Sequence, residues 1–263
     1  MKVLRTPDYR FKNLKDFPYE PNYTNIKDKS GVELRIHHVD EGPKDRPIVL
    51  LMHGQPVWSY LYRKMIPYLT KAGVRIIAPD LVGYGRSDKP SSIEDYTYQT
   101  QVDWMNAWLR QNDFKKITFF GQDWGGLIGL RVISDNGDRF SGAVISNTGV
   151  PLSRNMDPET HKQIKEFKAS KYVPTTSEFV RAFKKPGPMA FAYWQKWSLN
   201  KKNFPAGLLV APMFERRTRM KMKLSGIFYE LGLEGISPLV SDVEKAYNAP
   251  FPNSSYKMVC SCL

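Results

Sequence analysis

Over residues 47–147, short apolar segments alternate with longer segments of helical periodicity, and few folds accommodate that alternation. The short segments lie at residues 48–52, 74–79, 117–122 and 143–147. Their nearly continuous apolar character is typical of parallel strands that are buried on both faces. Between two of them, Val102, Met105 and Leu109 recur at helical spacing. The pattern predicts an α/β domain in which helices flank a mostly parallel sheet.

The regions on either side of this domain have different patterns. Residues 32–38 alternate between apolar and polar side chains, which predicts a half-buried antiparallel strand. After Pro151 the chain becomes helical, basic and aromatic, with breaks at Pro174, Pro186 and Pro188. We therefore expect a core over residues 1–150, a helical cap over residues 151–247, and a return to the core over residues 248–263.

The composition limits the partners that we expect. The formal net charge is +13, with basic residues dense over residues 154–202 and 216–223. No nucleic-acid-binding motif accompanies them, so we favour a solvated basic face over a nucleic-acid site. The sequence has no recognisable secretory signal or membrane span, which favours a cytoplasmic protein without a membrane partner. The two cysteines, Cys260 and Cys262, are too few for a disulfide framework or a metal site, and we expect a free, frayed pair.

The strongest local motif is a G-x-D-x-G sequence, Gly121-Gln122-Asp123-Trp124-Gly125, between a predicted buried strand and a predicted helix. In the related G-x-S-x-G motif, the glycines allow a sharp turn that exposes a nucleophile. Serine would displace a halide to leave a stable ether, whereas a carboxylate leaves an ester that water can hydrolyse. Asp123 is therefore a candidate nucleophile for attack on a halogen-bearing or epoxide carbon. The alternative is that it only caps the following helix.

A second motif, His53-Gly54-Gln55-Pro56, follows the strand predicted at residues 48–52. In this position the backbone N–H of Gln55 can lie beside that of Trp124 and form an oxyanion hole. A glycine-rich turn over residues 79–90 follows the next strand, and we assign it a role in positioning loops.

With these motifs the chain resembles the haloalkane dehalogenases, in particular those with Gln-Asp-Trp-Gly-Gly at the nucleophile. The resemblance extends over residues 1–213 and 236–257 and implies an α/β-hydrolase fold with a helical cap. It implies that Asp123 is the nucleophile and that Trp124 and Trp194 bind the leaving halide. An indole N–H is a donor without an acceptor lone pair, which suits an anion. Trp194 has the alternative of being a structural aromatic residue. Asn147 matches an Asn position of the same subfamily.

The implied reaction converts a small halogenated hydrocarbon and water into an alcohol and a halide, without a cofactor or a metal. Two departures from the family put turnover in doubt. The family takes its catalytic acid and base from segments that have no counterpart after Lys257, so the last strands of the sheet are expected to be missing and the strand at residues 143–147 to become an exposed edge. Residues 214–235 look like an unusual insertion, and residues 258–263 look like an aberrant tail.

The four histidines do not supply an obvious base. His37 and His38 belong to a predicted strand, His53 to the oxyanion segment and His161 to the cap. We therefore expect impaired turnover. Two alternatives stay open: an epoxide hydrolase, for which Tyr193 is available on the cap, or a noncatalytic remnant that keeps only the pocket. The oligomeric state is not predicted.

Overall fold

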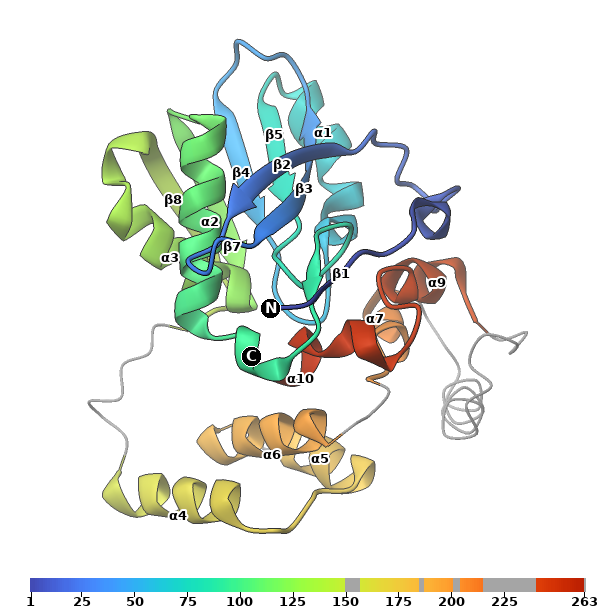
Figure 1. Cartoon of the computed structure of the whole chain (residues 1–263), viewed down its shortest axis with the longest axis vertical. Helices are drawn as coiled ribbons and strands as arrows, with labels where there is room; N and C mark the ends of the chain where they lie inside the picture. Colours follow the sequence, from blue (N-terminus) through green and yellow to red (C-terminus); the bar gives the residue numbers. More distant parts are fainter. Residues whose placement is uncertain (150–156, 185–186, 201–203, 215–239, 263) are drawn as a thin grey trace.

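The computed structural model describes residues 1–149, 157–184, 187–200, 204–214 and 240–262. A six-stranded sheet forms its centre, in the order β2-β3-β5-β4-β7-β8 (Figure 1). A separate two-stranded sheet pairs β1 with β6. The strands are β1 (Val3–Leu4), β2 (Asn22–Lys27), β3 (Glu33–Glu41), β4 (Ile48–Met52), β5 (Arg75–Pro79), β6 (Lys89–Pro90), β7 (Ile117–Gln122) and β8 (Phe140–Ser146).

The strand pairing confirms the predicted α/β fold. β2, β3 and β5 pair antiparallel, whereas β5, β4, β7 and β8 are parallel. The strands predicted at residues 48–52 and 117–122 have those bounds, and the antiparallel strand predicted at residues 32–38 is β3. β8 begins three residues earlier than predicted, at Phe140, because Phe140 pairs with Ile117 at the start of β7. Strand pairing sets that boundary, and the local apolar pattern does not reveal it.

Helices cover both faces of the central strands. α1 (Ile66–Lys71) packs against β5, α2 (Tyr98–Asn112) against β2 and α3, and α3 (Asp123–Asp135) against β7 and β8. Because parallel crossovers are right-handed, α1 lies on the face opposite to α2 and α3. The apolar stripe of Val102, Met105 and Leu109 is buried, as its helical spacing predicts. Short 3-10 helices connect these elements: η1 (Asp8–Phe11), η2 (Ser59–Lys64), η3 (Ile93–Asp95) and η4 (Gly137–Arg139).

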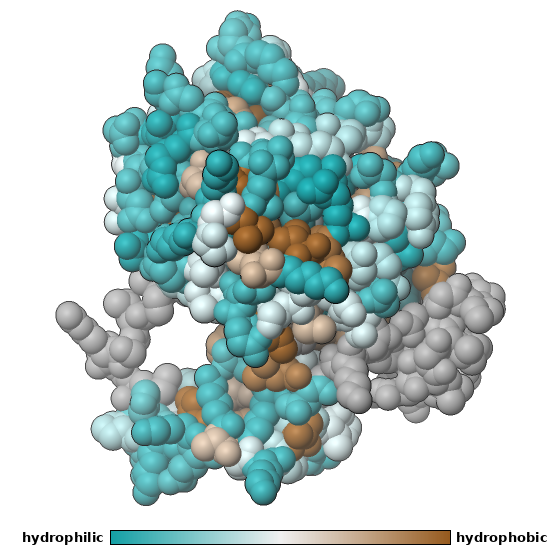
Figure 2. All heavy atoms as spheres, in the orientation of Figure 1, coloured by the Kyte–Doolittle hydropathy of each residue, from teal (hydrophilic) through white to brown (hydrophobic). Residues whose placement is uncertain are grey.

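Three helices form a layer apart from the body: α4 (Pro158–Ala169), α5 (Thr176–Phe183) and α6 (Pro188–Leu199) (Figure 1). All three fall in the range expected for the cap. α7 (Ala206–Phe214) packs against α9 (Asp242–Asn248). Hydrophilic residues cover most of the face in Figure 2, while hydrophobic residues gather in the middle of the body and in smaller groups toward the α4–α6 layer. The insertion expected at residues 214–235, apart from Phe214, lies outside the described residues, as does the basic tract at residues 216–223.

The expectation of a frayed cysteine pair is wrong for Cys260. After η6 (Ser254–Lys257), the chain forms a short helix, α10 (Val259–Cys262), which contacts α6 and η3. Val259 and Cys260 are both fully buried. The Val259 side chain packs so closely on Gly83 that a Cβ there would lie 2.6 Å from it. Moving the apolar side chains of Val259 and Cys260 from solvent into this packed position is favourable, and their burial holds the tail against the body.

β8 is the exposed edge that the sequence predicts. Among the described residues, β8 pairs with β7 on one side only. Its apolar side chains are open to solvent, with Val144 52% exposed and Ile145 44% exposed. No helix within the described ranges is long and apolar enough to cross a membrane.

One buried histidine makes the stability of this fold depend on pH. His38 in β3 is 5% exposed and meets Trp108 and Phe114 edge-on. Burial lowers its pKa from the ordinary value of 6.5 to about 4. Between these two values the unfolded chain binds a proton that the folded chain excludes, so acidification favours unfolding.

We therefore predict that His38 costs the protein stability on the order of 2 kcal/mol between about pH 7 and pH 5. Urea unfolding at both pH values measures this loss. In His38→Gln, which cannot titrate, the difference between the two pH values should be smaller by that amount. An equal pH dependence in the two proteins would contradict the assignment.

Candidate functional site

Asp123 lies at the sharp turn where β7 ends and α3 begins. Its φ is +52°, in the left-handed region that residues other than glycine rarely adopt. Two bonds from the segment after β8 hold this turn. The Asp123 N–H donates to the Asn147 carbonyl at 3.0 Å, and the Thr148 hydroxyl donates to the Asp123 carbonyl at 2.7 Å. The strained conformation is therefore fixed from the neighbouring strand.

The motif glycines allow the turn to pack closely on its surroundings. A Cβ at Gly125 would lie 2.3 Å from the Met52 carbonyl oxygen, and one at Gly126 would lie 2.6 Å from the Thr148 side chain. Neither position has room for a side chain, because α3 starts directly against the end of β4 and the segment after β8. This close approach explains the Gly-Gly that follows Asp123-Trp124.

Two backbone N–H groups meet the Asp123 carboxylate. The Gln55 N–H donates to Asp123 Oδ1 at 2.8 Å, and the Trp124 N–H also bonds to this carboxylate. Gln55 follows β4, and Trp124 is in the first turn of α3. The structure thus brings together the three residues that the two sequence motifs singled out at this point.

The electrostatic environment of Asp123 has opposing components. Burial raises the pKa of its carboxyl above the ordinary value, and the N–H groups of Trp124 and Gln55 and the nearby His53 partly counteract this. Hydrogen bonds to a carboxylate favour its charged form. The group is therefore a desolvated carboxylate held by fixed dipoles, which is a suitable nucleophile.

A cavity of about 570 Å³ opens beside the Asp123 carboxylate. Its walls come from the segment after β4, from η2, from β7 and from α7. The lining is mainly apolar, with a few polar groups around Asp123, as in small-molecule sites. The lining residues are Gln55, Pro56, Val57, Leu61, Tyr62, Arg63, Lys64, Met65, Phe120, Gln122, Asp123, Ser146, Asn147, Val210 and Met213.

The two candidate tryptophans lie in different surroundings. Trp124 is half-buried against the core, beside the nucleophile. Trp194 is on α6, within an aromatic cluster in which its ring centroid lies 5.5 Å from that of Phe179, 5.9 Å from Trp197 and 5.6 Å from Phe204. Neither tryptophan is among the described residues that line the cavity. The structure therefore does not bring Trp194 to Asp123 through this cavity.

The histidines are engaged elsewhere. His53 is fully buried; its Nδ1 bonds to the Gly54 carbonyl at 2.8 Å, and its Nε2 accepts from the Leu81 N–H at 3.0 Å. These partners define a neutral tautomer, in agreement with a pKa that burial lowers. His37 bonds to Asp80, as described below, and His161 is exposed on α4. Sequence reasoning gave the turn at residues 79–90 a positioning role without singling out Asp80. It missed Thr148, which lies just after a predicted strand.

The described part of the chain contains no group of three His, Cys, Asp or Glu residues placed to hold a metal ion. The polar groups at Asp123 are instead a carboxylate and two backbone amides, an arrangement that can bind and stabilise a negative charge.

Comparison with known proteins identifies the family to which the chain is similar. A family model described as the alpha/beta hydrolase fold matches residues 47–200. A haloalkane dehalogenase of Psychrobacter cryohalolentis is 42% identical over 257 residues, which cover 98% of this chain and 68% of the relative. One of Mycolicibacterium paratuberculosis is 37% identical over the same shares. The solved structure of a tetrameric haloalkane dehalogenase from Paraglaciecola agarilytica has a TM-score of 0.69 and 30% identity, covering 100% of this chain and 71% of the other.

Gly54 provides a test of the contact between the Gln55 segment and Asp123. A Cβ at Gly54 would lie 2.2 Å from Asp123 Oδ1 and 2.4 Å from Asp123 Cβ. We predict that Gly54→Ala lowers the free energy of unfolding by about 1–3 kcal/mol, the usual cost of overpacking. Urea unfolding measures it.

Gly137→Ala is the matched control, because a Cβ there meets nothing within 4 Å. In an Asp123→Gly background, which lacks the clashing atoms, the cost of Gly54→Ala should shrink. An undiminished cost in that background would mean that the clash is not with Asp123.

Proposed function

Because the chain belongs to the haloalkane dehalogenase family of the α/β-hydrolase fold, we propose that it cleaves carbon–halogen bonds with Asp123 as its nucleophile. The observation that carries the assignment is the partly buried Asp123 carboxylate, held by the Gln55 N–H at 2.8 Å beside an apolar cavity. The substrate is a small halogenated hydrocarbon, which an apolar cavity of this size accommodates.

In the first step, an Asp123 oxygen attacks the carbon that bears the halogen. The new carbon–oxygen bond forms as the carbon–halogen bond breaks, and the bonding pair leaves with the halide. Trp124 and Trp194 donate their indole N–H groups to this halide. The role of Trp124 is supported by its position next to Asp123. The role of Trp194 is supported by its position on α6 and by the resemblance in sequence. This step needs no proton transfer.

In the second step, water attacks the carbonyl carbon of the alkyl ester, and the carbonyl oxygen takes up negative charge. The N–H groups of Gln55 and Trp124, which already bond to the carboxylate, stabilise this oxyanion. The attacking water must lose a proton to a base. His53 is locked between Gly54 and Leu81, and His37 bonds to Asp80. We propose that the second step is slow in this 263-residue chain.

Mass spectrometry after incubation with 1-bromohexane tests the first step. We predict one added alkyl group per chain, because displacement requires only the carboxylate and the pocket. Asp123→Asn should prevent the addition. Absence of both the adduct and bromide release in the wild-type protein would contradict the assignment of Asp123, and would favour a noncatalytic pocket.

The same incubation tests the second step. Without general-base assistance, worth about 10²–10⁴-fold in rate, bromide release should stop close to one equivalent. Sustained release over many turnovers would overturn the proposal of a slow second step while leaving Asp123 as the nucleophile.

Bromide quenching of tryptophan fluorescence tests the halide donors. We predict quenching in the wild-type protein and reduced quenching in Trp194→Phe. Trp197→Phe is the matched control, because Trp197 lies on the same helix but donates its Nε1–H to Thr176 at 3.3 Å. Equal quenching in the wild-type protein and Trp194→Phe would leave Trp194 as a structural member of the aromatic cluster.

A further inference from the structure

The position of the Gln55 N–H depends on residues 53–58, which connect β4 to η2 without regular secondary structure. A loop of this kind has no ladder of backbone bonds to fix it, so its position depends on contacts with other segments. Its N–H at Gln55 has to lie within hydrogen-bond distance of Asp123, and an error of about 1 Å in such a site can cost about 100-fold in rate.

Both ends of this segment are bonded to the same dipeptide, Asp80-Leu81, which directly follows β5. At the start of the segment, His53 Nε2 accepts from the Leu81 N–H at 3.0 Å. At its end, the Ser59 N–H donates to Asp80 Oδ1 at 2.8 Å. The Gln55 N–H therefore lies between two hydrogen bonds that tie its segment to the residues directly after β5.

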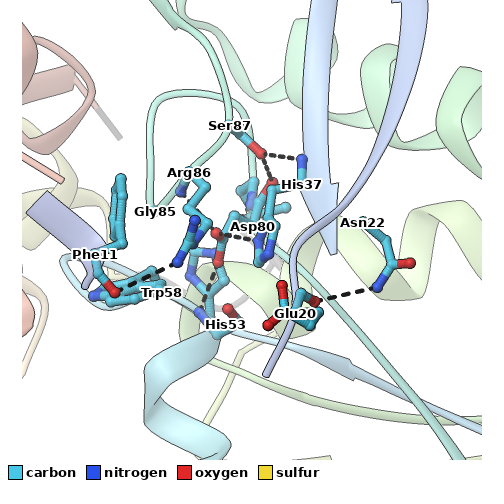
Figure 3. Close-up of polar contacts among 12 residues, drawn as sticks. Phe11, Glu20, Asn22, His37, His53, Trp58, Asp80, Gly85, Arg86 and Ser87 are labelled. Atoms are coloured by element: carbon cyan, nitrogen blue, oxygen red, sulfur yellow. Dashed lines mark hydrogen bonds and ion pairs between the residues drawn. The ribbon is translucent and has the colours of Figure 1, made fainter. Parts of the chain in front are cut away.

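Asp80 is itself fixed on every side (Figure 3). It is fully buried, and its Oδ2 accepts from His37 Nδ1 at 2.7 Å and from the Arg86 N–H at 2.8 Å. A Cβ at Gly85, whose φ is +48°, would lie 2.0 Å from Asp80 Oδ2. The turn closes on the carboxylate only because residue 85 is glycine.

The Asp80 side chain is ionised in this environment. Burial alone would raise its pKa, but the attraction and hydrogen bond of His37, the nearby His53 and the Ser59 N–H outweigh burial and hold the pKa well below its ordinary range. Charge-assisted hydrogen bonds are stronger than neutral ones. A charged Asp80 therefore holds Ser59 more firmly than a neutral acceptor would.

We propose that Asp80, fixed by His37, is a positioning residue that holds the Gln55 N–H in place for the oxyanion of the Asp123 ester. Asp80 does not touch the substrate and acts through the backbone of residues 53–59. The proposal rests on the role of Asp123 given above. It assigns a function to the buried hydrogen bond between His37 and Asp80, which the two-step reaction above does not use.

Asp88 offers a matched control on the same turn. It is 1% exposed, and its carboxylate also accepts three hydrogen bonds: from Arg5 Nε at 2.7 Å, from Arg5 Nη2 at 2.8 Å and from the Arg35 N–H at 2.8 Å. None of these bonds leads to residues 53–59. Asp80→Asn and Asp88→Asn thus remove the same charge from the same turn, and only the first loosens the Gln55 segment.

The first measurement is the amide resonance of Gln55 in the ¹⁵N-labelled full chain. In Asp123→Ala this N–H has lost its carboxylate acceptor, so the resonance of that variant marks the position of the unbonded amide. We expect Asp80→Asn to shift this resonance toward that position and Asp88→Asn to leave it near the wild-type position. This measurement does not depend on alkylation, so it remains decisive if Asp123 forms no adduct. An unmoved resonance in Asp80→Asn, or equal shifts in the two variants, would overturn the proposal.

The second measurement is the rate at which hydroxylamine removes the alkyl group from the alkylated protein, since hydroxylamine supplies its own nucleophile. We expect Asp80→Asn to slow this loss about 10- to 100-fold relative to Asp88→Asn, below the full effect of deleting an oxyanion donor. Thermal unfolding of both variants provides the correction for global destabilisation. If Asp80→Asn does not fold, His37→Gln replaces it and should slow the loss of the alkyl group by a smaller factor. A wild-type rate of loss in whichever of these two variants folds would overturn the proposal.

Discussion

The hydrogen bond from the Gln55 N–H to Asp123 Oδ1 depends on most of the central sheet. β7 places Asp123 at its end, β4 leads into the segment that contains Gln55, and β5 leads into Asp80, which anchors that segment. The segment after β8 holds the left-handed turn at Asp123 through Thr148. Parallel strands end at one edge of a sheet, so four short loops can meet there with few residues each. A buried carboxylate is costly unless such donors surround it.

The α10 tail and helix α9 contact the same edge from outside the sheet. The Gln55 side chain donates to the Cys260 carbonyl, and Val259 packs on Gly83 in the glycine-rich turn. α10 also contacts α6, so the docked tail joins the body to the α4–α6 layer. The indole of Trp58 adds a second link, to the Ala246 carbonyl in α9 at 3.1 Å. The Gln55 segment and the α4–α6 layer are therefore both in contact with α10.

Strand β8, unlike this well-packed region, is exposed to solvent. Exposed Val144 and Ile145 form an apolar strand with a free hydrogen-bonding edge within the described residues, and such an edge favours association with another chain. The same strand supplies Ser146 and leads into Asn147, both of which line the cavity beside Asp123. The site thus lies next to an exposed edge of the sheet.

The sequence by itself determined the α/β class, the strands at residues 48–52 and 117–122, and the elbow at Asp123, because apolar periodicity and glycine spacing are local properties. It also predicted which backbone amides meet at Asp123. It did not reveal the start of β8, the burial of Cys260 or the attachment of residues 53–59 to Asp80. Each of these depends on segments distant in sequence. β8 starts at Phe140 because Phe140 pairs with β7, and Cys260 is buried because α10 packs beside α6. Asp80 holds residues 53–59 through its bonds to His37 and Ser59. Only the tertiary structure decides such contacts, because burial and hydrogen bonding between distant segments leave no periodic signal along the chain.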